Sequence, residues 1–139
     1  MNRILVICTD NVSRSPMAEG IIQKIIEENQ MEGVTVQSAG LSASDGESSS
    51  DYAIEALHEI GIDISGHRSR RVVIEDLMKA DCIYVMTPQH RDVILDAMPE
   101  ISSKIIVMEI SDPSGQELIR FRNCRDEMIA FFHKELSGG

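Results

Sequence analysis

Cysteine is scarce in this 139-residue chain, and the three that occur, at positions 8, 82 and 124, lie far apart. They are too few and too scattered for the disulfide framework of a secreted protein. No two of them form the Cys-x-x-Cys pair of a zinc site, so we expect no bound metal. The cysteine pattern therefore indicates a protein of a reduced compartment.

Long apolar runs are also missing. None approaches the roughly 18 residues that a membrane-spanning helix needs. The first seven residues, 1–7, lead directly into an apolar run, without the basic flank and small-residue cleavage site of a signal peptide. We therefore expect a cytoplasmic protein without a membrane partner.

Positively charged residues are fewer than negatively charged ones. The chain has 13 Lys and Arg against 23 Asp and Glu, which gives a formal net charge of -10. Such a protein repels nucleic acid phosphates, so a broad polyanion-binding surface and a nucleic acid partner are not expected. Any site for an anion must be built locally, from a few residues.

What the chain does have is the composition of an ordinary globular protein, with 42% hydrophobic and 26% charged residues. Its length fits one domain, which we expect to span residues 1–139. The sequence does not fix the oligomeric state.

Short apolar runs alternate along the chain with segments of helical periodicity. The predicted strands are 3–8, 34–38, 82–86 and 105–108, and the predicted helices are 15–28, 51–60, 73–79, 88–97 and 116–136. The first helix should begin with Ser15 as its N-cap and Pro16 as its first residue. This alternation predicts an α/β fold of three layers, with a four-stranded parallel sheet in the order 2-1-3-4 and helices on both faces.

The most informative segment is CTDNVSRSP, residues 8–16, which lies between the first predicted strand and the first predicted helix. Ligands of open parallel sheets bind beyond the carboxyl ends of the strands, where free N–H groups of a loop and a helix start attract anions. Cys8 and Arg14 would share this positive field, which lowers the pKa of a thiol and makes it nucleophilic. The planar guanidinium of arginine matches two phosphoryl oxygens at once.

The segment CTDNVSRSPMAEG, residues 8–20, closely resembles the active-site segment of the low-molecular-weight protein tyrosine phosphatases and of their arsenate reductase relatives. Further motifs occur in the order of that family: the SAG segment at 38–40, His67, the strand ending at Met86 and Thr87, and Asp112 followed by Pro113. The resemblance covers nearly the whole chain.

This resemblance implies a phosphoric monoester hydrolase that forms a cysteinyl-phosphate intermediate and needs no cofactor. Cys8 would be the nucleophile, Arg14 the group that holds the phosphoryl in the transition state, and Asp112 the general acid. The expected partner is a phosphorylated protein or a small phosphomonoester. The loop that binds it would comprise Thr9, Asp10, Asn11, Val12, Ser13, Arg14 and Ser15. Around that loop, a hydrogen-bonded set would hold its shape, made of Asn11, Ser15, Ser38 and His67.

Asp10 departs from the family, which usually has glycine there. A carboxylate about 7 Å from a thiolate and a bound dianion costs roughly 2 kcal/mol at an effective dielectric near 20. If the position needs a positive φ, aspartate is among the few residues that tolerate it. We therefore expect either low activity or an Asp10 that turns outward and receives a basic group of the substrate.

Other departures leave the substrate open. Ser13 replaces a cysteine common in the family, so a protective disulfide with Cys8 is excluded. Ser114 and Gly115 stand where phosphotyrosine enzymes of the family usually present aromatic residues, so the wall that stacks on a tyrosine ring is missing. Val12 is apolar where arginine phosphatases of the family resemble one another in having threonine. Phosphotyrosine, phosphoarginine, another phosphomonoester and arsenate all remain open.

Two other functions remain alternatives. The first is an arsenate reductase that depends on an external thiol. An internal partner is not expected, because Cys82 begins the third strand while Cys8 ends the first. At about 3.3 Å per residue the two lie on the order of 15 Å apart, beyond the roughly 7 Å limit for Cα atoms of a disulfide. Cys124 lies within the last helix, without an evident route to Cys8. The second alternative is a regulatory module that binds phosphate but has lost turnover through Asp10.

Overall fold

The structure, a computed structural model, describes residues 3–137, and the first two and last two residues of the expected domain lie outside this part. Its four strands are β1 (Arg3–Cys8), β2 (Thr35–Gly40), β3 (Cys82–Val85) and β4 (Ile105–Val107). They pair in parallel, in the order β2-β1-β3-β4. The predicted fold class and strand order are therefore confirmed.

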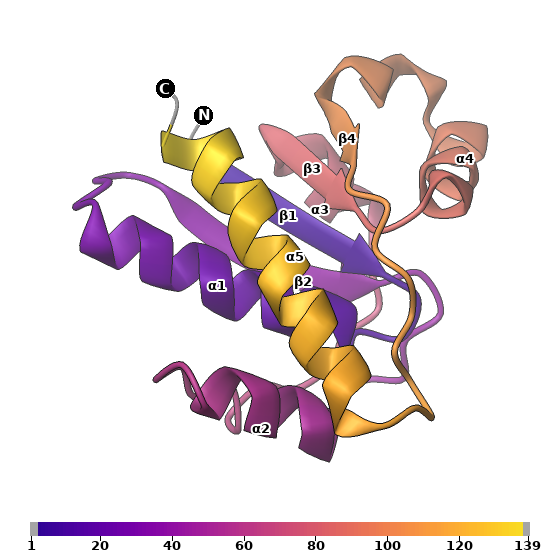
Figure 1. The fold of residues 1–139 in the computed structure, drawn as a ribbon. Helices are drawn as coiled ribbons and strands as arrows, with labels where there is room; N and C mark the ends of the chain where they lie inside the picture. The colour runs from indigo at the N-terminus through magenta and orange to yellow at the C-terminus, as the bar shows by residue number, and fades with distance from the viewer. Residues whose placement is uncertain (1–2, 138–139) are drawn as a thin grey trace.

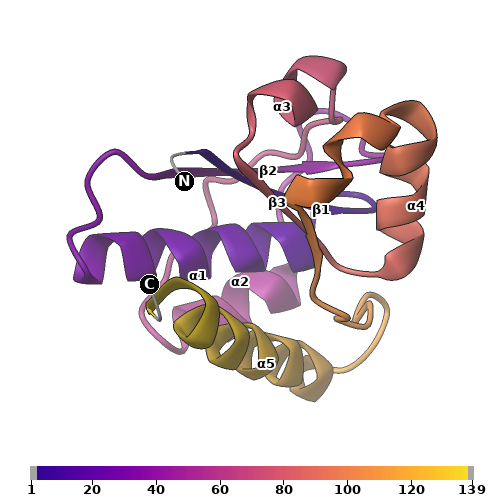
Figure 2. The same ribbon diagram turned by 90° about the horizontal axis from the view of Figure 1, so that it is seen from above.

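Helices cover both faces of this sheet, as Figures 1 and 2 show. On one face lie α1 (Arg14–Glu28), α2 (Asp51–His58) and α5 (Leu118–Ser137). On the other lie α3 (Ile74–Lys79), α4 (Pro88–Ala97) and the short 3-10 helix η1 (Pro99–Lys104). Because both faces are covered, β1 is apolar from Ile4 to Cys8 instead of alternating with polar residues.

Alternate residues of β1 belong to two separate cores. Ile4, Val6 and Cys8 pack with the layer of α1 and α5, whereas Leu5 and Ile7 pack with the layer of α3 and α4. This division follows from the two-residue period of a strand. The last residue of the strand, Cys8, is thereby held at the carboxyl edge of the sheet with 1% of its surface exposed.

The start of α1 differs from the prediction. The helix begins at Arg14, Ser13 occupies the N-cap position without a capping side-chain hydrogen bond, and Ser15 lies inside the first turn. The expected cap at Ser15 is therefore wrong. Its hydroxyl group is instead turned toward the loop, where it contacts Cys8 and Asn11.

Other boundaries shift by a few residues. The second strand continues to Gly40, two residues beyond its expected end, and the last helix begins at Leu118 instead of residue 116. The helix expected at 51–60 ends at His58, before Gly61, whose φ of 80° suits a residue without a side chain. The helix η1 was not predicted.

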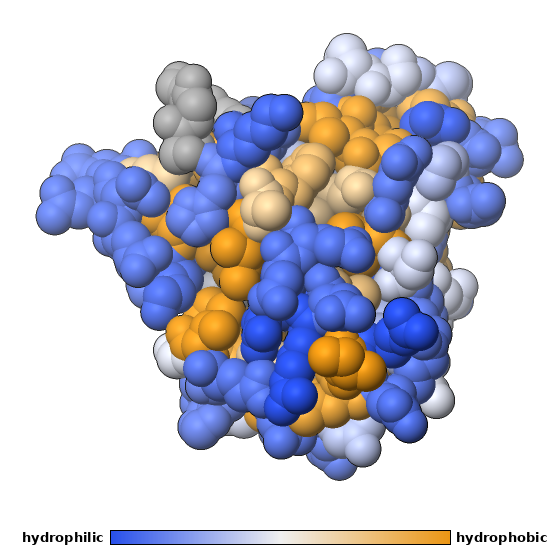
Figure 3. Space-filling view, viewed as in Figure 1, coloured by the Kyte–Doolittle hydropathy of each residue, from blue (hydrophilic) through white to orange (hydrophobic). Residues whose placement is uncertain are grey.

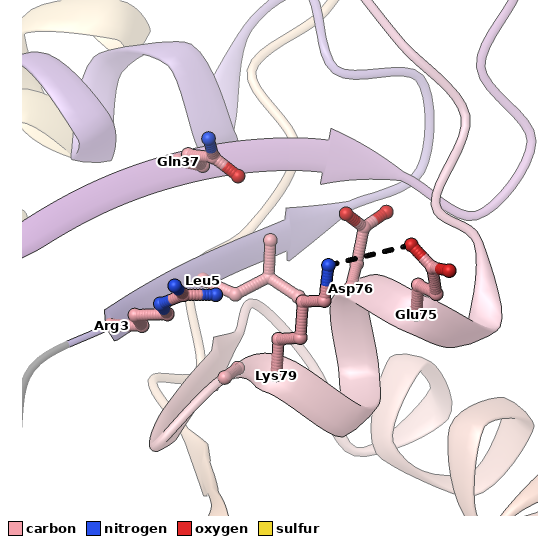
Figure 4. Close-up of a pocket in the computed structure, with 7 residues that line it drawn as sticks. Arg3, Leu5, Gln37, Glu75, Asp76 and Lys79 are labelled. Atoms are coloured by element: carbon pink, nitrogen blue, oxygen red, sulfur yellow. Dashed lines mark ion pairs between the residues drawn. The ribbon is translucent and has the colours of Figure 1, made fainter.

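The outer surface over α5 is mostly hydrophilic, with hydrophobic residues in several patches (Figure 3). Within residues 3–137, no helix combines the length and apolar character needed to cross a membrane. A polar pocket of about 220 Å³ lies beside α3 and the first half of β1 (Figure 4). It includes Leu5 and its neighbour Gln37, and therefore lies away from the carboxyl edge where ligands of such sheets bind.

Candidate active site

Residues 9–13 form the loop between β1 and α1, at the carboxyl edge of the sheet. Asn11 has a φ of 60°, a left-handed conformation that asparagine tolerates better than most residues. The backbone N–H of Asn11 donates a hydrogen bond to Cys8 Sγ at 3.3 Å. The loop thus curls around the sulfur. The φ of Asp10 is not positive, so the left-handed residue of the loop is Asn11.

Cys8 lies at the centre of this loop, with Sγ 3.0 Å from the Ser15 hydroxyl oxygen. Burial raises the pKa of the Cys8 thiol, hydrogen bonds with Ser15 and Asn11 act in the opposite direction, and the charge of Asp10 adds a smaller increase. The expectation of a lowered pKa is therefore wrong for this geometry. Desolvation outweighs the stabilising hydrogen bonds, and the Arg14 guanidinium is directed elsewhere.

The Asn11 side chain links the residues expected to hold the loop. Its Nδ2 donates to Ser15 Oγ at 2.7 Å and to Ser38 Oγ at 3.0 Å. Its Oδ1 accepts from the backbone N–H of Arg70 at 3.0 Å. The backbone oxygen of Asn11 lies 2.9 Å from Nε2 of His67. The structure thus brings Asn11, Ser15, Ser38 and His67 together.

Glu19 extends this network and was missed from the sequence. The hydroxyl group of Ser38 donates to Glu19 Oε1, and Nδ1 of His67 lies 3.8 Å from the same oxygen. A glutamate in a helix is usually solvated, so the sequence alone gave it no role. Its position four residues after Ser15, on the same face of α1, was the available signal.

Gly40 supports the loop from outside. A Cβ atom there would lie 2.7 Å from the backbone oxygen of Thr9 and 3.0 Å from the nitrogen of Asn11. The backbone N–H groups of the next two residues, Leu41 and Ser42, donate to the oxygens of Cys8 and Thr9. The end of β2 can therefore approach the loop closely only because residue 40 lacks a side chain.

Arg14 is 5% exposed and points toward the segment after β4. Its NH1 donates to the backbone oxygen of Ile110 at 2.9 Å, and its NH2 lies 3.9 Å from Asp112 Oδ2. Asp112 Oδ1 accepts from the Ser114 N–H at 2.9 Å. Burial acts to raise the pKa of the Asp112 carboxyl, but the hydrogen bonds from Ser114 and the charge of Arg14 outweigh it, so this pKa lies below its ordinary value.

Asp10 turns back onto the loop instead of outward. Its Oδ1 accepts a hydrogen bond from the backbone N–H of Val12 at 3.2 Å, the arrangement of an Asx turn. Both side chains are half-buried. Asp10 therefore contributes a loop hydrogen bond as well as a negative charge near Cys8.

We expect Asp10→Asn to separate these two contributions. Asparagine keeps an oxygen acceptor for Val12 but loses the charge, so the pKa of Cys8 should fall and inhibition by inorganic phosphate should strengthen roughly three- to tenfold. The measurements are the pH dependence of Cys8 alkylation and the inhibition constant of phosphate. Asp10→Gly, which lacks the acceptor too, serves for comparison. An Asn variant unchanged in both measurements would show that the charge of Asp10 has no effect at the sulfur.

His90, in the first turn of α4, is a second residue that the sequence did not reveal. Its Nε2 lies 2.9 Å from Thr9 Oγ1, and its buried Nδ1 has no hydrogen-bond partner among the described residues. Burial, and then the charge of Arg14, lower the pKa of His90. Its position just after β3, the strand next to β1, was a signal that it would lie at the same edge of the sheet.

The other two cysteines lie in β3 and in α5. Cys82 pairs in register with Ile4, at the end of the sheet opposite to Cys8, as its position in the third strand predicts. Cys124 is buried in α5, and its Sγ contacts the backbone oxygen of Ser111 at 3.4 Å. All three cysteines are free.

The chain is similar to known phosphatases over most of its length. Residues 3–133 match the model of the family described as low molecular weight phosphotyrosine protein phosphatase. The protein-arginine-phosphatase of Geobacillus stearothermophilus is 36% identical, over 91% of this chain and 88% of that protein. A probable low molecular weight protein-tyrosine-phosphatase of Ralstonia nicotianae, EpsP, is 32% identical, over 91% and 87%.

A solved structure shows the same similarity in three dimensions. The crystal structure of the low molecular weight protein tyrosine phosphatase of T. tengcongensis superposes with a TM-score of 0.94 at 32% identity, covering 100% of both chains. Together with the parallel sheet and the loop that surrounds Cys8, these similarities show that the chain belongs to the low molecular weight phosphotyrosine protein phosphatase family.

Proposed function

We propose that residues 1–139 form one phosphatase domain, which acts in the cytoplasm on phosphorylated tyrosine of proteins through a cysteinyl-phosphate on Cys8. The observation that carries the proposal is the loop between β1 and α1, which closes around Sγ with an N–H of Asn11 and the hydroxyl group of Ser15. These two hydrogen bonds act to lower the pKa of the Cys8 thiol against the effect of burial, which raises it. Free N–H groups at a helix start also attract a bound anion.

In the first step, the Cys8 thiolate attacks phosphorus, the bond to the ester oxygen breaks, and that oxygen takes a proton from Asp112. In the second step, water attacks the phosphocysteine, gives a proton to Asp112, and releases inorganic phosphate and the thiolate. Arg14 lies at the start of α1 and carries a fork that holds two phosphoryl oxygens in both steps.

Asp112 must be protonated to act as an acid in the first step, yet its pKa lies below the ordinary value. Substrate binding should raise this pKa. A phosphoryl dianion draws the Arg14 guanidinium to itself and places negative charge near Asp112, and both effects raise the pKa of a carboxyl group. The ion pair at 3.9 Å is long enough to be exchanged for a bidentate contact with the substrate.

We expect Asp112→Asn to slow hydrolysis of an ester with a poor leaving group, such as phenyl phosphate, by about 10²-fold. p-Nitrophenyl phosphate should suffer less, because its leaving oxygen needs little protonation. The variant should also lose the decline of kcat at alkaline pH that deprotonation of an acid causes. Equal losses for both esters, with an unchanged pH profile, would contradict the role of Asp112 as an acid.

Phosphoarginine is a second candidate substrate, favoured by the 36% identity to a protein-arginine-phosphatase. Val12, half-buried in the loop, and the Ser114 and Gly115 pair do not select between the two substrates. An arsenate reductase is not favoured by the similarities, which are to phosphatases. Cys82, at the far end of the sheet, also cannot serve as an internal resolving thiol.

The test is turnover of four substrates by the wild-type protein: p-nitrophenyl phosphate, a phosphotyrosyl peptide, the matching phosphoarginyl peptide, and arsenate with a thiol reductant. We expect hydrolysis of the first two. If kcat/KM is higher for the phosphoarginyl peptide than for the phosphotyrosyl peptide, phosphoarginine becomes the proposed substrate. Reduction of arsenate without hydrolysis of any phosphate ester would overturn it.

A further inference from the structure

A groove of about 650 Å³ lies between the start of α2 and the loop that leads into α5. Its two sides come from segments far apart in the sequence. The lining residues are Ser50, Asp51, Tyr52, Gly115, Gln116, Glu117 and Phe121. None of the residues that surround Cys8 belongs to this lining, so the groove is separate from the site of the chemistry.

The groove nevertheless lies next to the active-site loop, because Ser50, which lines the groove, contacts that loop. Ser13 Oγ, in that loop, lies 3.0 Å from Ser50 Oγ and 3.4 Å from Ser114 Oγ. The backbone N–H of Ser50 donates to the oxygen of Val12 at 2.8 Å. A side chain that places its phosphoryl group beside Cys8 must therefore bring its neighbours along the peptide close to this groove, at about 3.5 Å of chain per residue.

The chemistry of the groove fits a basic side chain. Asp51 and Glu117 contribute carboxylates from opposite sides, and, among residues 3–137, no lysine, arginine or histidine lines the groove. Tyr52 is 44% exposed, and its ring is packed edge-on against that of Phe121, with ring centroids 5.6 Å apart. An aromatic face beside carboxylates accommodates both the aliphatic stem and the charge of lysine or arginine.

We propose that this groove binds a lysine or arginine that flanks the phosphorylated residue of the protein substrate. The inference rests on the proposed function, because it places the substrate's phosphoryl group beside Cys8. The preference for a flanking lysine or arginine would come from α2 and the loop before α5, and not from an aromatic wall around the phosphorylated ring.

The first experiment compares phosphotyrosyl peptides that differ only in the residues next to phosphotyrosine: lysine, glutamine or glutamate. We expect kcat/KM to fall in that order, with lysine over glutamate by about three- to tenfold, because two exposed charge pairs contribute roughly two- to threefold each. The double variant Asp51→Asn with Glu117→Gln should abolish the difference. Its kcat/KM for p-nitrophenyl phosphate, which has no flanking residues, should equal that of the wild type.

A matched control removes the same charge elsewhere. Asp96 and Glu100, in α4 and η1, are exposed and lie outside the groove. Asp96→Asn with Glu100→Gln should keep the preference for the lysine peptide, because a local contact depends on the groove and not on net charge. For the ring, Tyr52→Ala should weaken the preference and Tyr52→Phe should keep it.

Binding of the same peptides to the Cys8→Ser variant, measured by calorimetry, tests the groove without any turnover. We expect the lysine peptide to bind more tightly than the glutamate peptide by the same three- to tenfold, and the margin to shrink as salt is added. Equal affinities, or a preference that survives in the Asp51 and Glu117 double variant, would overturn the inference. Absent turnover of every phosphate ester would overturn the proposed function alone, because the binding comparison would still give its answer.

Discussion

Cys8→Ser is expected to lower the rate of p-nitrophenyl phosphate hydrolysis by on the order of 10⁴-fold or more, since loss of a nucleophile removes the whole covalent path. A serine hydroxyl has a far higher pKa than a thiol, and the two groups that hydrogen-bond to Sγ, the Ser15 hydroxyl and the Asn11 N–H, are not bases. The variant should still bind inorganic phosphate, because the N–H groups of the loop and Arg14 remain.

Acid quenching during turnover provides the direct measurement. Wild-type protein should carry one phosphoryl group on the peptide that contains Cys8, detected by mass spectrometry, and the serine variant should not accumulate it during turnover. Cys82→Ser is the matched control, since Cys82 pairs with Ile4 at the far end of the sheet and should leave the rate unchanged. Hydrolysis by Cys8→Ser at a rate comparable to the wild type would rule out Cys8 as the nucleophile.

Arg14→Lys is expected to reduce kcat/KM by about 10³-fold although it keeps the positive charge. Arginine presents a rigid planar fork, whereas lysine offers one flexible ammonium that cannot contact two phosphoryl oxygens in the same plane. Arg14 NH1 donates to the backbone oxygen of Ile110 at 2.9 Å. Because the lysine side chain is shorter, this oxygen should lose its partner in the variant. The loss should therefore exceed what a change of charge position alone would cause.

The division between kcat and KM identifies the step that needs Arg14. If the fork mainly holds the transition state, kcat should fall much more than the affinity for inorganic phosphate. Arg91→Lys is the control, because Arg91 pairs with Asp92 on the exposed side of α4. Matching thermal unfolding midpoints would show that the Arg14 variant is folded. An Arg14→Lys enzyme whose kcat/KM is within a few-fold of the wild-type value would contradict the need for the planar guanidinium.

The parallel sheet was predictable because the alternation of strands and helices is visible along the chain, and the order 2-1-3-4 is a common one for sheets built from such units. Each strand is a short apolar run, since a strand covered on both faces needs no polar side, and the segments between them show helical periods. The Cys8 to Ser15 segment could be identified because its cysteine, its arginine and the residues between them are contiguous. The boundaries were less predictable, and the start of α1 was misplaced because Ser15 uses its hydroxyl in the loop instead of as a cap.

The balance of charges at Cys8 was not predictable from proximity along the chain. Arg14 is six positions from Cys8, yet its guanidinium is held by the oxygen of Ile110 and lies near Asp112, both almost a hundred residues later. Burial then dominates the pKa of the thiol, and burial depends on the packing of both helix layers. Similarly, the charge of Arg14, which meets Asp112 only in the fold, adds to the local hydrogen bonds from Ser114 that lower the pKa of this carboxyl.

The sequence by itself determined the α/β architecture with its parallel sheet and the position of the loop between β1 and α1, because both are encoded by residues that are neighbours in the chain. Only the tertiary structure decided which distant groups surround that loop: Glu19 beside Ser38 and His67, and His90 beside Thr9. It also decided that Asp51 and Glu117 line one groove. These contacts join segments separated by many residues, and their formation depends on how strands and helices pack, which no local pattern specifies.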